Sequence, residues 1–157
     1  MTPLQTDILK LEITIIDSTI ARIDQIQHSI RNWTISTWGG SILLVVEHLE
    51  KGGIYLMLTA LIPVFFGYFD VVWKQALLRV DYRQQRIAKF VNSGMQEKGD
   101  FWILDPTGAK YESELDFKQK TAWFKAFEYK GTGWFYVFLS LLSVIFGVVS
   151  HFNACYG

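Results

Sequence analysis

Charged side chains are missing from one long stretch of the sequence, and acidic side chains are rare in another. Residues 131–157 contain no Asp, Glu, Lys or Arg, and residues 51–80 contain a single acid, Asp70. A soluble domain normally covers its surface with such residues, so these stretches point away from a soluble fold. The 157-residue chain has a formal net charge of zero, and its overall charge therefore favours no particular charged partner.

Cysteine and metal-binding patterns are also scarce. Cys155 is the only cysteine, so no intrachain disulfide is possible, and no Cys/His cluster has the spacing of a metal site. There is no serine in a nucleophile-elbow setting and no phosphate-binding glycine loop. The N-terminus lacks an early apolar run followed by a cleavage site, so we expect no signal peptide. We expect no enzymatic activity, no metal and no cofactor.

Long apolar runs are what the sequence has instead. Half of the chain is apolar and 16% is aromatic. A transmembrane helix needs about 20 mainly apolar residues. Ile54–Trp73 and Gly133–Ser150 meet this need, whereas Trp33–Val46 is short and partly polar, and its alternative is a buried core helix. The sequence predicts an all-α membrane protein with three transmembrane helices.

Basic residues are distributed unevenly around these three runs. Segment 1–32 carries three Lys or Arg and segment 74–132 carries eleven, whereas only Lys51 lies between the first two runs and none follows Ser150. Because basic loops stay in the cytoplasm, we expect a cytoplasmic N-terminus and a periplasmic C-terminus in the bacterial inner membrane. The predicted parts are a cytoplasmic helix, a transmembrane hairpin, a cytoplasmic region and a third span with an outer tail: 1–32, 33–73, 74–132 and 133–157.

Two segments carry the 4,3 spacing of a helical seam. Segment 4–32 alternatively starts as a strand, because "LEITIID" alternates, but the length of its seam favours a helix that continues into Trp33. Its seam residues are Leu9, Ile13, Ile16, Ile20, Ile23, Gln27 and Ile30. The second seam continues the helix of the second span as far as residues 92–94, and its residues are Trp73, Leu77, Val80, Gln84, Ile87 and Val91. Each seam is expected to pack on the other, forming a bundle, or on a copy from another subunit.

The segment before the third span is expected to be less regular. Residues 95–115 contain the turn sequence Asp105-Pro106-Thr107-Gly108, which predicts a small hairpin or an ordered loop. Residues 117–130 mix lysines with Phe and Trp, a composition typical of a helix lying in the lipid headgroups. Residues 131–133 then allow the chain to bend into the third span.

The first apolar run begins with hydroxyl groups and glycines, "WTISTWGGS". Thr34, Thr37 and Ser41 share one helix face, which indicates either a water-filled path or the close approach of a second helix. Acids at the outer end would favour cations in a pore mouth. The candidate pore-lining residues are Thr34, Thr37, Ser41, Glu47 and His48. The candidate hinges are Gly39, Gly40 and Pro63, the last expected to kink the second span.

Charged residues near the cytoplasmic side form a second group of candidates. Asp70 is either an ion site within the membrane or the partner of Lys74 or Arg31. A row of cations follows the second span, and its first member lies close enough to reach lipid phosphates. This row is either a solvated face paired with Asp7, Asp17 or Asp24, or an anion site for a nucleotide or oligonucleotide. The candidate ligand-binding residues are Arg79, Arg83, Arg86 and Lys89.

Two stretches together resemble a known family. They are "LEITIIDSTIARIDQIQHSIRNWTISTWGGS" and "PVFFGYFDVVWKQALLRVDYRQQRIAKFVNS". They resemble the channel-forming effectors of Hailong anti-phage defence systems over roughly residues 5–95, together with the last span. The resemblance implies an oligomer that permeabilises the inner membrane and is controlled by a nucleotide signal from a partner nucleotidyltransferase. It would make Arg83 and Arg86 signal contacts and the Thr34, Thr37 and Ser41 row the conduit.

Two classes of function follow from these patterns. The first is a gated pore built from several copies, with a tetramer as the expected homo-oligomer, because three spans cannot enclose a water path. The second is a non-conducting anchor that recruits a cytoplasmic partner to the lipid bilayer. A phage holin fits the size of the chain but not its long seamed helices.

Overall fold

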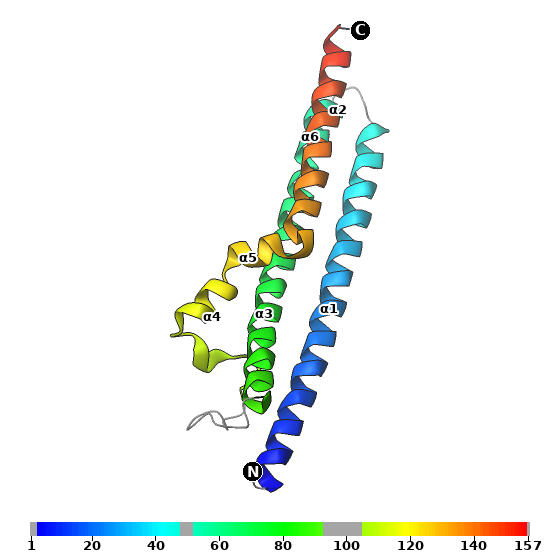
Figure 1. The fold of residues 1–157 in the computed structure, drawn as a ribbon. Helices are drawn as coiled ribbons and strands as arrows, with labels where there is room; N and C mark the ends of the chain where they lie inside the picture. The colour runs from blue at the N-terminus through cyan, green and yellow to red at the C-terminus, as the bar shows by residue number, and fades with distance from the viewer. Residues whose placement is uncertain (1–2, 48–51, 93–104, 157) are drawn as a thin grey trace. The chain divides into compact units, whose positions relative to one another are not determined.

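The computed structural model describes residues 3–47, 52–92 and 105–156, and the regular elements in these ranges are all helices (Figure 1). The all-α class is therefore confirmed. Three helices are long: α1 (Pro3–Val46), α3 (Leu61–Asn92) and α6 (Thr132–Tyr156). The shorter elements are α2 (Gly52–Leu58), η3 (Ala109–Tyr111), α4 (Leu115–Lys120), α5 (Trp123–Glu128) and η4 (Tyr129–Gly131).

The chain divides into two compact units. The first, called here the polar unit, consists of Met1–Ile26 and Trp73–Ala126. The second, called the apolar unit, consists of Gln27–Val72 and Phe127–Gly157. Both α1 and α3 contribute one segment to each unit. Helix α1 runs without a break from the seam into the first apolar run, as the sequence predicts.

The polar unit has a core between the first part of α1 and the second part of α3, which run side by side (Figure 1). Leu9 and Ile16 of α1 pack there with Val80, Ile87 and Phe90 of α3. Burying such side chains contributes about 1.5–3 kcal/mol each. Of the two expected partners for the seam, the structure therefore provides the other helix of the same chain.

A second core of the polar unit is aromatic. The Tyr82 ring lies edge-on to the rings of Tyr111 and Phe117, with centroids 5.5 and 5.2 Å away. Gly108 precedes this cluster with φ of 69°, and a Cβ there would lie 3.2 Å from the Arg79 carbonyl oxygen. The left-handed turn and the close approach to α3 together explain a glycine at this position.

An ordered loop, and no hairpin, occupies residues 105–108 and leads into η3. Asp105 holds the loop, because its carboxylate accepts hydrogen bonds from the backbone N–H groups of Ala109 and Lys110 at 3.1 and 3.0 Å. No strand occurs in the described ranges, and the predicted first β-like run at 101–104 lies outside them. Asx-type hydrogen bonds of this kind compete with regular strand pairing, which accounts for the loop.

The apolar unit contains a close contact between α2 and α6. A Cβ added at Gly147 would lie 2.6 Å from Met57 Cγ and 2.7 Å from the Gly53 carbonyl oxygen. Small residues let helix backbones approach this closely, as is common between helices in membranes. Gly53 and Gly147 are therefore needed for the packing within the chain.

The sequence predicts that the second apolar run is one continuous helix with a kink at Pro63, and this prediction is wrong. The helix breaks at Thr59–Ala60, and Pro63 is the third residue of α3. Proline has no N–H to donate to the carbonyl four residues earlier, and its ring clashes with that carbonyl. The Thr59 carbonyl instead accepts a hydrogen bond from the Ile62 N–H at 3.2 Å. The hinge role of Pro63 stays a prediction.

Two helical stretches in the described part of the chain are long and apolar enough to cross a membrane. They are Gly53–Asn92 and Leu115–Phe152, and only 33% and 22% of their most apolar windows are buried within the chain. The core helix of a soluble protein would be mostly buried. These stretches support the membrane assignment, whereas α1 does not meet the same test and the first span stays a prediction.

Candidate functional site

The predicted hydroxyl row on α1 does not have one uniform environment. Thr34 is fully buried, and its hydroxyl donates to the Ile30 carbonyl oxygen at 2.7 Å. Thr37 is exposed, and Ser41 is half-buried with its hydroxyl donating to the Thr37 carbonyl oxygen at 2.7 Å. The structure thus places Thr34 in the packing of its own chain and Thr37 on the surface. The pore-lining role of the row stays a prediction.

A tryptophan between these hydroxyls ties α1 to α6. The Trp38 Nε1–H donates to Ser143 Oγ at 2.7 Å, and the Ser143 hydroxyl lies 3.2 Å from the Leu139 carbonyl oxygen. Ser143 is fully buried. We did not predict this contact, because the spacing of residues along α1 carries no information on what a distant helix presents to it.

The two glycines that follow are not required by the chain's own packing. A Cβ added at Gly39 or Gly40 would meet no other described atom within 4 Å beyond its immediate helix. Gly40 is exposed, and so are Ser36 and Thr37 on the same side of α1. The helix continues without a break through both glycines, and their hinge role stays a prediction.

The predicted pore mouth is only partly described. Glu47 lies in the turn after α1 and is exposed. His48 lies outside the described residues. The acidic ring proposed for the mouth therefore rests on Glu47 in the described part of the chain.

Asp70 is the centre of a buried polar cluster in the apolar unit. Its Oδ2 accepts hydrogen bonds from Arg31 Nε at 3.2 Å and from the Tyr136 hydroxyl at 2.9 Å. Arg31 also lies 3.4 Å from Thr132 Oγ1, and Gln27 donates to the Asp70 carbonyl oxygen. The contact with Arg31, one of the alternatives considered for Asp70, is confirmed.

The second carboxylate oxygen of Asp70 has a different environment. Oδ1 is buried and has no hydrogen-bond partner among the described residues. A buried acceptor without a partner costs about 1–3 kcal/mol. The carboxylate is therefore held through one oxygen only, by side chains from α1 and α6.

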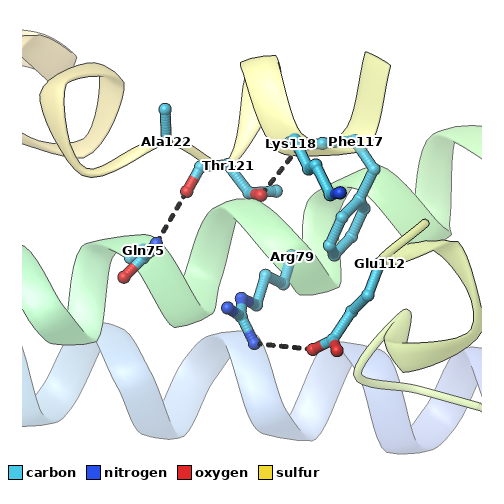
Figure 2. A pocket seen from close by; sticks show the side chains of 7 residues that line it. All are labelled: Gln75, Arg79, Glu112, Phe117, Lys118, Thr121 and Ala122. Carbon is cyan, nitrogen blue, oxygen red and sulfur yellow. Dashed lines mark hydrogen bonds and ion pairs between the residues drawn. The ribbon is translucent and has the colours of Figure 1, made fainter. Parts of the chain in front are cut away.

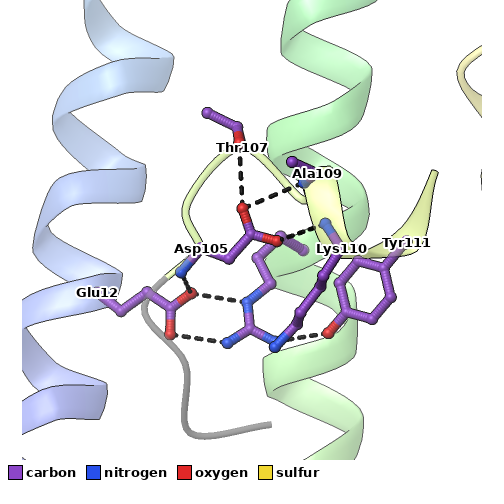
Figure 3. A network of polar contacts seen from close by, with 7 residues as sticks. Glu12, Asp105, Thr107, Ala109, Lys110 and Tyr111 are labelled. Carbon is purple, nitrogen blue, oxygen red and sulfur yellow. Dashed lines mark hydrogen bonds and ion pairs between the residues drawn. The ribbon is translucent and has the colours of Figure 1, made fainter. Parts of the chain in front are cut away.

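A second, larger network in the polar unit includes Glu12, Asp105 and Tyr111, which are labelled in Figure 3. Arg83 lies at the centre of this network. Its Nε and Nη2 donate to the two carboxylate oxygens of Glu12 at 2.7 and 2.8 Å, and its Nη1 donates to the Tyr111 hydroxyl at 2.6 Å. Arg83 is fully buried and Glu12 is only 2% exposed. The Asp105 backbone N–H adds a further bond to Glu12 at 3.3 Å. The guanidinium thus forms a bidentate ion pair inside the protein.

The predicted partners of the cationic row are not the ones found. Asp7, Asp17 and Asp24 are exposed, and Glu12 pairs with Arg83 instead. Glu12 could have been found from the sequence, because it lies on the same helix face as Leu9 and Ile16. A carboxylate on a buried face requires a cation opposite it.

The other members of the row are more accessible. Arg86 Nη2 lies 3.8 Å from Glu114 Oε1, and its guanidinium lies 5.2 Å from the centre of the Tyr111 ring. Lys89 is exposed. The row predicted as one ligand site is therefore divided between a buried structural arginine and outer cations.

Arg79 lines a pocket of about 280 Å³ within the polar unit (Figure 2). Gln75 and Arg79 enter it from α3, Glu112 from the loop, and Phe117 and Lys118 from α4. Arg79 Nη1 lies 3.3 Å from Glu112 Oε1, and both side chains are largely exposed. The pocket wall therefore carries two cations and one carboxylate.

The described residues contain no group of His, Cys, Asp and Glu arranged to hold a metal ion. The chain matches no family model, no curated protein and no solved structure.

Proposed function

We propose that the chain is one subunit of a homo-oligomeric, gated ion-conducting pore in the bacterial inner membrane. The observation that supports this best is the outer face of α1, where exposed Ser36, Thr37 and Gly40 alternate with exposed apolar side chains. Ser36 and Gly40 are four residues apart and give a small-xxx-small pattern, which suits close contact with another helix. Among the described residues, no atom outside the local helix backbone lies within 4 Å of a Cβ added at Gly40, so a second copy is the natural partner.

The topology of the proposed subunit has three spans. The first part of the transmembrane region is Trp33–Val46 of α1, and the second and third are the apolar parts of α2–α3 and α6. The distribution of Lys and Arg supports a cytoplasmic polar unit and a periplasmic C-terminus. Because one such subunit cannot enclose a water path, we propose several copies around an axis, with four as the expected number.

The proposed signal is a nucleotide or a short oligonucleotide made by a partner enzyme in anti-phage defence. This follows the resemblance to Hailong effectors and the chemistry of the outer cations, since arginine matches phosphate geometry. Arg86 and Lys89 are the candidate contacts. Arg83 is committed to Glu12, and a substitution there would act on the fold before it acted on a ligand.

Gly40→Leu is expected to break the assembly without unfolding the subunit. Leucine favours a helix more than glycine does, and a Cβ at this position meets no described atom within 4 Å outside the local helix backbone. It would, however, keep a neighbouring α1 from approaching. Light scattering of the detergent-solubilised protein should report a smaller particle. The matched control is Ile35→Phe, which enlarges an exposed side chain on a different face of α1 and should leave the size unchanged. An unchanged size for Gly40→Leu would contradict this interface.

Conduction itself is tested in liposomes that contain the purified chain. Thr37→Leu should reduce the conductance severalfold, because it replaces an exposed hydroxyl with an apolar constriction. Glu47→Lys should shift the reversal potential toward anions, because it inverts the charge at the mouth. Current recordings of both variants against the parent measure these effects. If both conduct and select as the parent does, the water path does not follow α1.

The alternative function is a non-conducting anchor that recruits a cytoplasmic partner. The burial of Thr34 favours it, because a hydroxyl used for packing within the chain contributes nothing to a conduit. The same liposome recordings separate the two proposals. A parent protein that inserts and assembles but carries no current would support the anchor.

A further inference from the structure

We propose that the pocket beside Arg79 binds a phosphate–ammonium zwitterion, the chemistry of an ethanolamine phosphate headgroup. This site goes beyond the proposed pore and does not depend on it. The pocket holds about 280 Å³, which suits a headgroup but not a polymer. The ligand could be a membrane lipid or a free phosphate ester, and both offer the same charged groups.

The cations of the pocket suit the phosphate. Arg79 comes from α3 and Lys118 from α4, so two separate elements present positive charge to one space (Figure 2). Lys118 is exposed, and none of the ion pairs found between described residues includes it. A guanidinium fork and a mobile ammonium together are a common arrangement for binding a phosphate.

The carboxylate of the pocket suits the ammonium and disfavours other anions. Glu112 lies on the pocket wall, only 3.3 Å from Arg79, and its side chain is 59% exposed. A chain of phosphates would meet repulsion there, whereas an ammonium two carbon atoms from a phosphate would find an acceptor. The present Arg79–Glu112 pair has one contact between exposed groups, and such pairs contribute little and are readily exchanged.

The position of the pocket suits a lipid as the source. Gln75 and Arg79 follow Trp73, the last residue of the second apolar run, by ~3 and ~9 Å along α3. In the same unit, Trp123 and Phe124 of α5 are 39% and 74% exposed. Exposed aromatic side chains near lysines are typical of segments in the headgroup region.

The first arm of the test uses soluble headgroups and the full chain in detergent. Calorimetric titration should show binding of phosphoethanolamine in preference to phosphocholine, whose quaternary nitrogen has no N–H to donate. Arg79→Gln with Lys118→Gln should weaken phosphoethanolamine binding about tenfold or more, because charge-assisted hydrogen bonds are lost. Glu112→Gln should remove the preference for ethanolamine over choline.

The second arm distinguishes the source of the headgroup. The chain is placed in nanodiscs of mixed phosphatidylethanolamine and phosphatidylcholine, and retained lipid is identified by native mass spectrometry. The site is assigned to the lipid if the parent chain retains phosphatidylethanolamine, the double variant does not, and the free headgroup does not bind. Binding of the free headgroup supports the same chemistry with a soluble ester as an additional source.

Controls keep the proposal open to refutation. Arg22→Gln removes an exposed cation of the polar unit outside the pocket and should change neither arm. Lys118→Gln alone changes an exposed side chain and should fold even if the double variant does not. Absence of an ethanolamine preference in both arms would overturn the proposal, and so would equal losses for Arg22→Gln and the pocket variants. Neither arm requires the chain to conduct ions. If the liposome recordings contradict the proposed pore, the test of headgroup binding is unaffected.

Discussion

Glu12→Ala is expected to lower the free energy of unfolding of the polar unit by about 3–5 kcal/mol, because it removes the carboxylate that forms an ion pair with the buried Arg83 guanidinium. Arg83 is fully buried, and Glu12 accepts two of its three hydrogen bonds in the described contacts. Thermal melting and hydrogen exchange of 3–26 and 73–92 measure the loss. We expect these amides to exchange faster than those of the apolar unit.

Arg83 cannot escape this penalty by losing its proton. Burial lowers the pKa of the Arg83 guanidinium, but the hydrogen bonds and charge of Glu12 outweigh it and raise that pKa above its ordinary value. Arginine is protonated even without such help. When Glu12 is removed, the charged form remains in a site that no longer compensates it.

Two comparisons separate the charge effect from ordinary side-chain loss. Glu12→Met with Arg83→Met removes both charges, and paired apolar replacements are often neutral or stabilising. Glu112→Ala breaks the exposed pair with Arg79 and should cost less than about 1 kcal/mol. A double methionine variant as unstable as Glu12→Ala would contradict the role given to the buried Arg83 charge.

The Glu12–Arg83 ion pair shows which features of the polar unit the sequence pattern predicts and which it does not. The 4,3 spacing predicts the α1 helix and the face containing Leu9 and Ile16, both of which are buried. It also assigns Ile13 to the seam, but Ile13 is 37% exposed and Glu12 is buried. A seam defined by apolar residues leaves Glu12 out although Glu12 shares the buried face, and its partner Arg83 lies 71 residues away in the sequence.

The candidate pore face shows a different limit. Periodicity correctly groups Thr34 and Ser41 on one side of α1, but it does not say what covers that side. In the chain, the buried Ser143 of α6 bonds Trp38 on the same part of the helix. The exposed small residues Ser36 and Gly40 lie on another face, which the sequence alone did not single out.

Helix breaks depend on competing local bonds. Pro63 indicates that the helix is interrupted nearby, but the break lies at Thr59–Ala60. There the Thr59 carbonyl accepts a hydrogen bond from the Ile62 N–H, because Pro63 has no N–H to donate to it. Likewise, the sequence predicts the turn at Asp105. The choice between hairpin and loop depends on which backbone N–H groups donate hydrogen bonds to the Asp105 carboxylate.

Asp70→Ala is expected to lower the free energy of unfolding of the apolar unit by about 1.5–3 kcal/mol, the range for hydrogen bonds to charged groups. It removes the acceptor shared by Arg31 and the Tyr136 hydroxyl. The loss should be smaller than at Glu12, because the Arg31 side chain is 39% exposed and can be solvated by water, whereas the Arg83 side chain is fully buried. Reversible unfolding in mixed detergent micelles, followed by circular dichroism, measures it.

A double-mutant cycle identifies which role Asp70 has. If the contact with Arg31 stabilises the unit, Arg31→Ala and Asp70→Ala should be non-additive by about 0.5–3 kcal/mol, as for residues in direct contact. Tyr136→Phe, which removes one hydrogen bond and little volume, should cost about 1 kcal/mol. An ion site predicts the opposite result, because Asp70→Ala would then alter conduction in liposomes while leaving stability unchanged. Since Oδ1 is buried inside the single chain and Oδ2 is already shared by two donors, we expect the cycle to show coupling and the stability loss to appear without any partner copy.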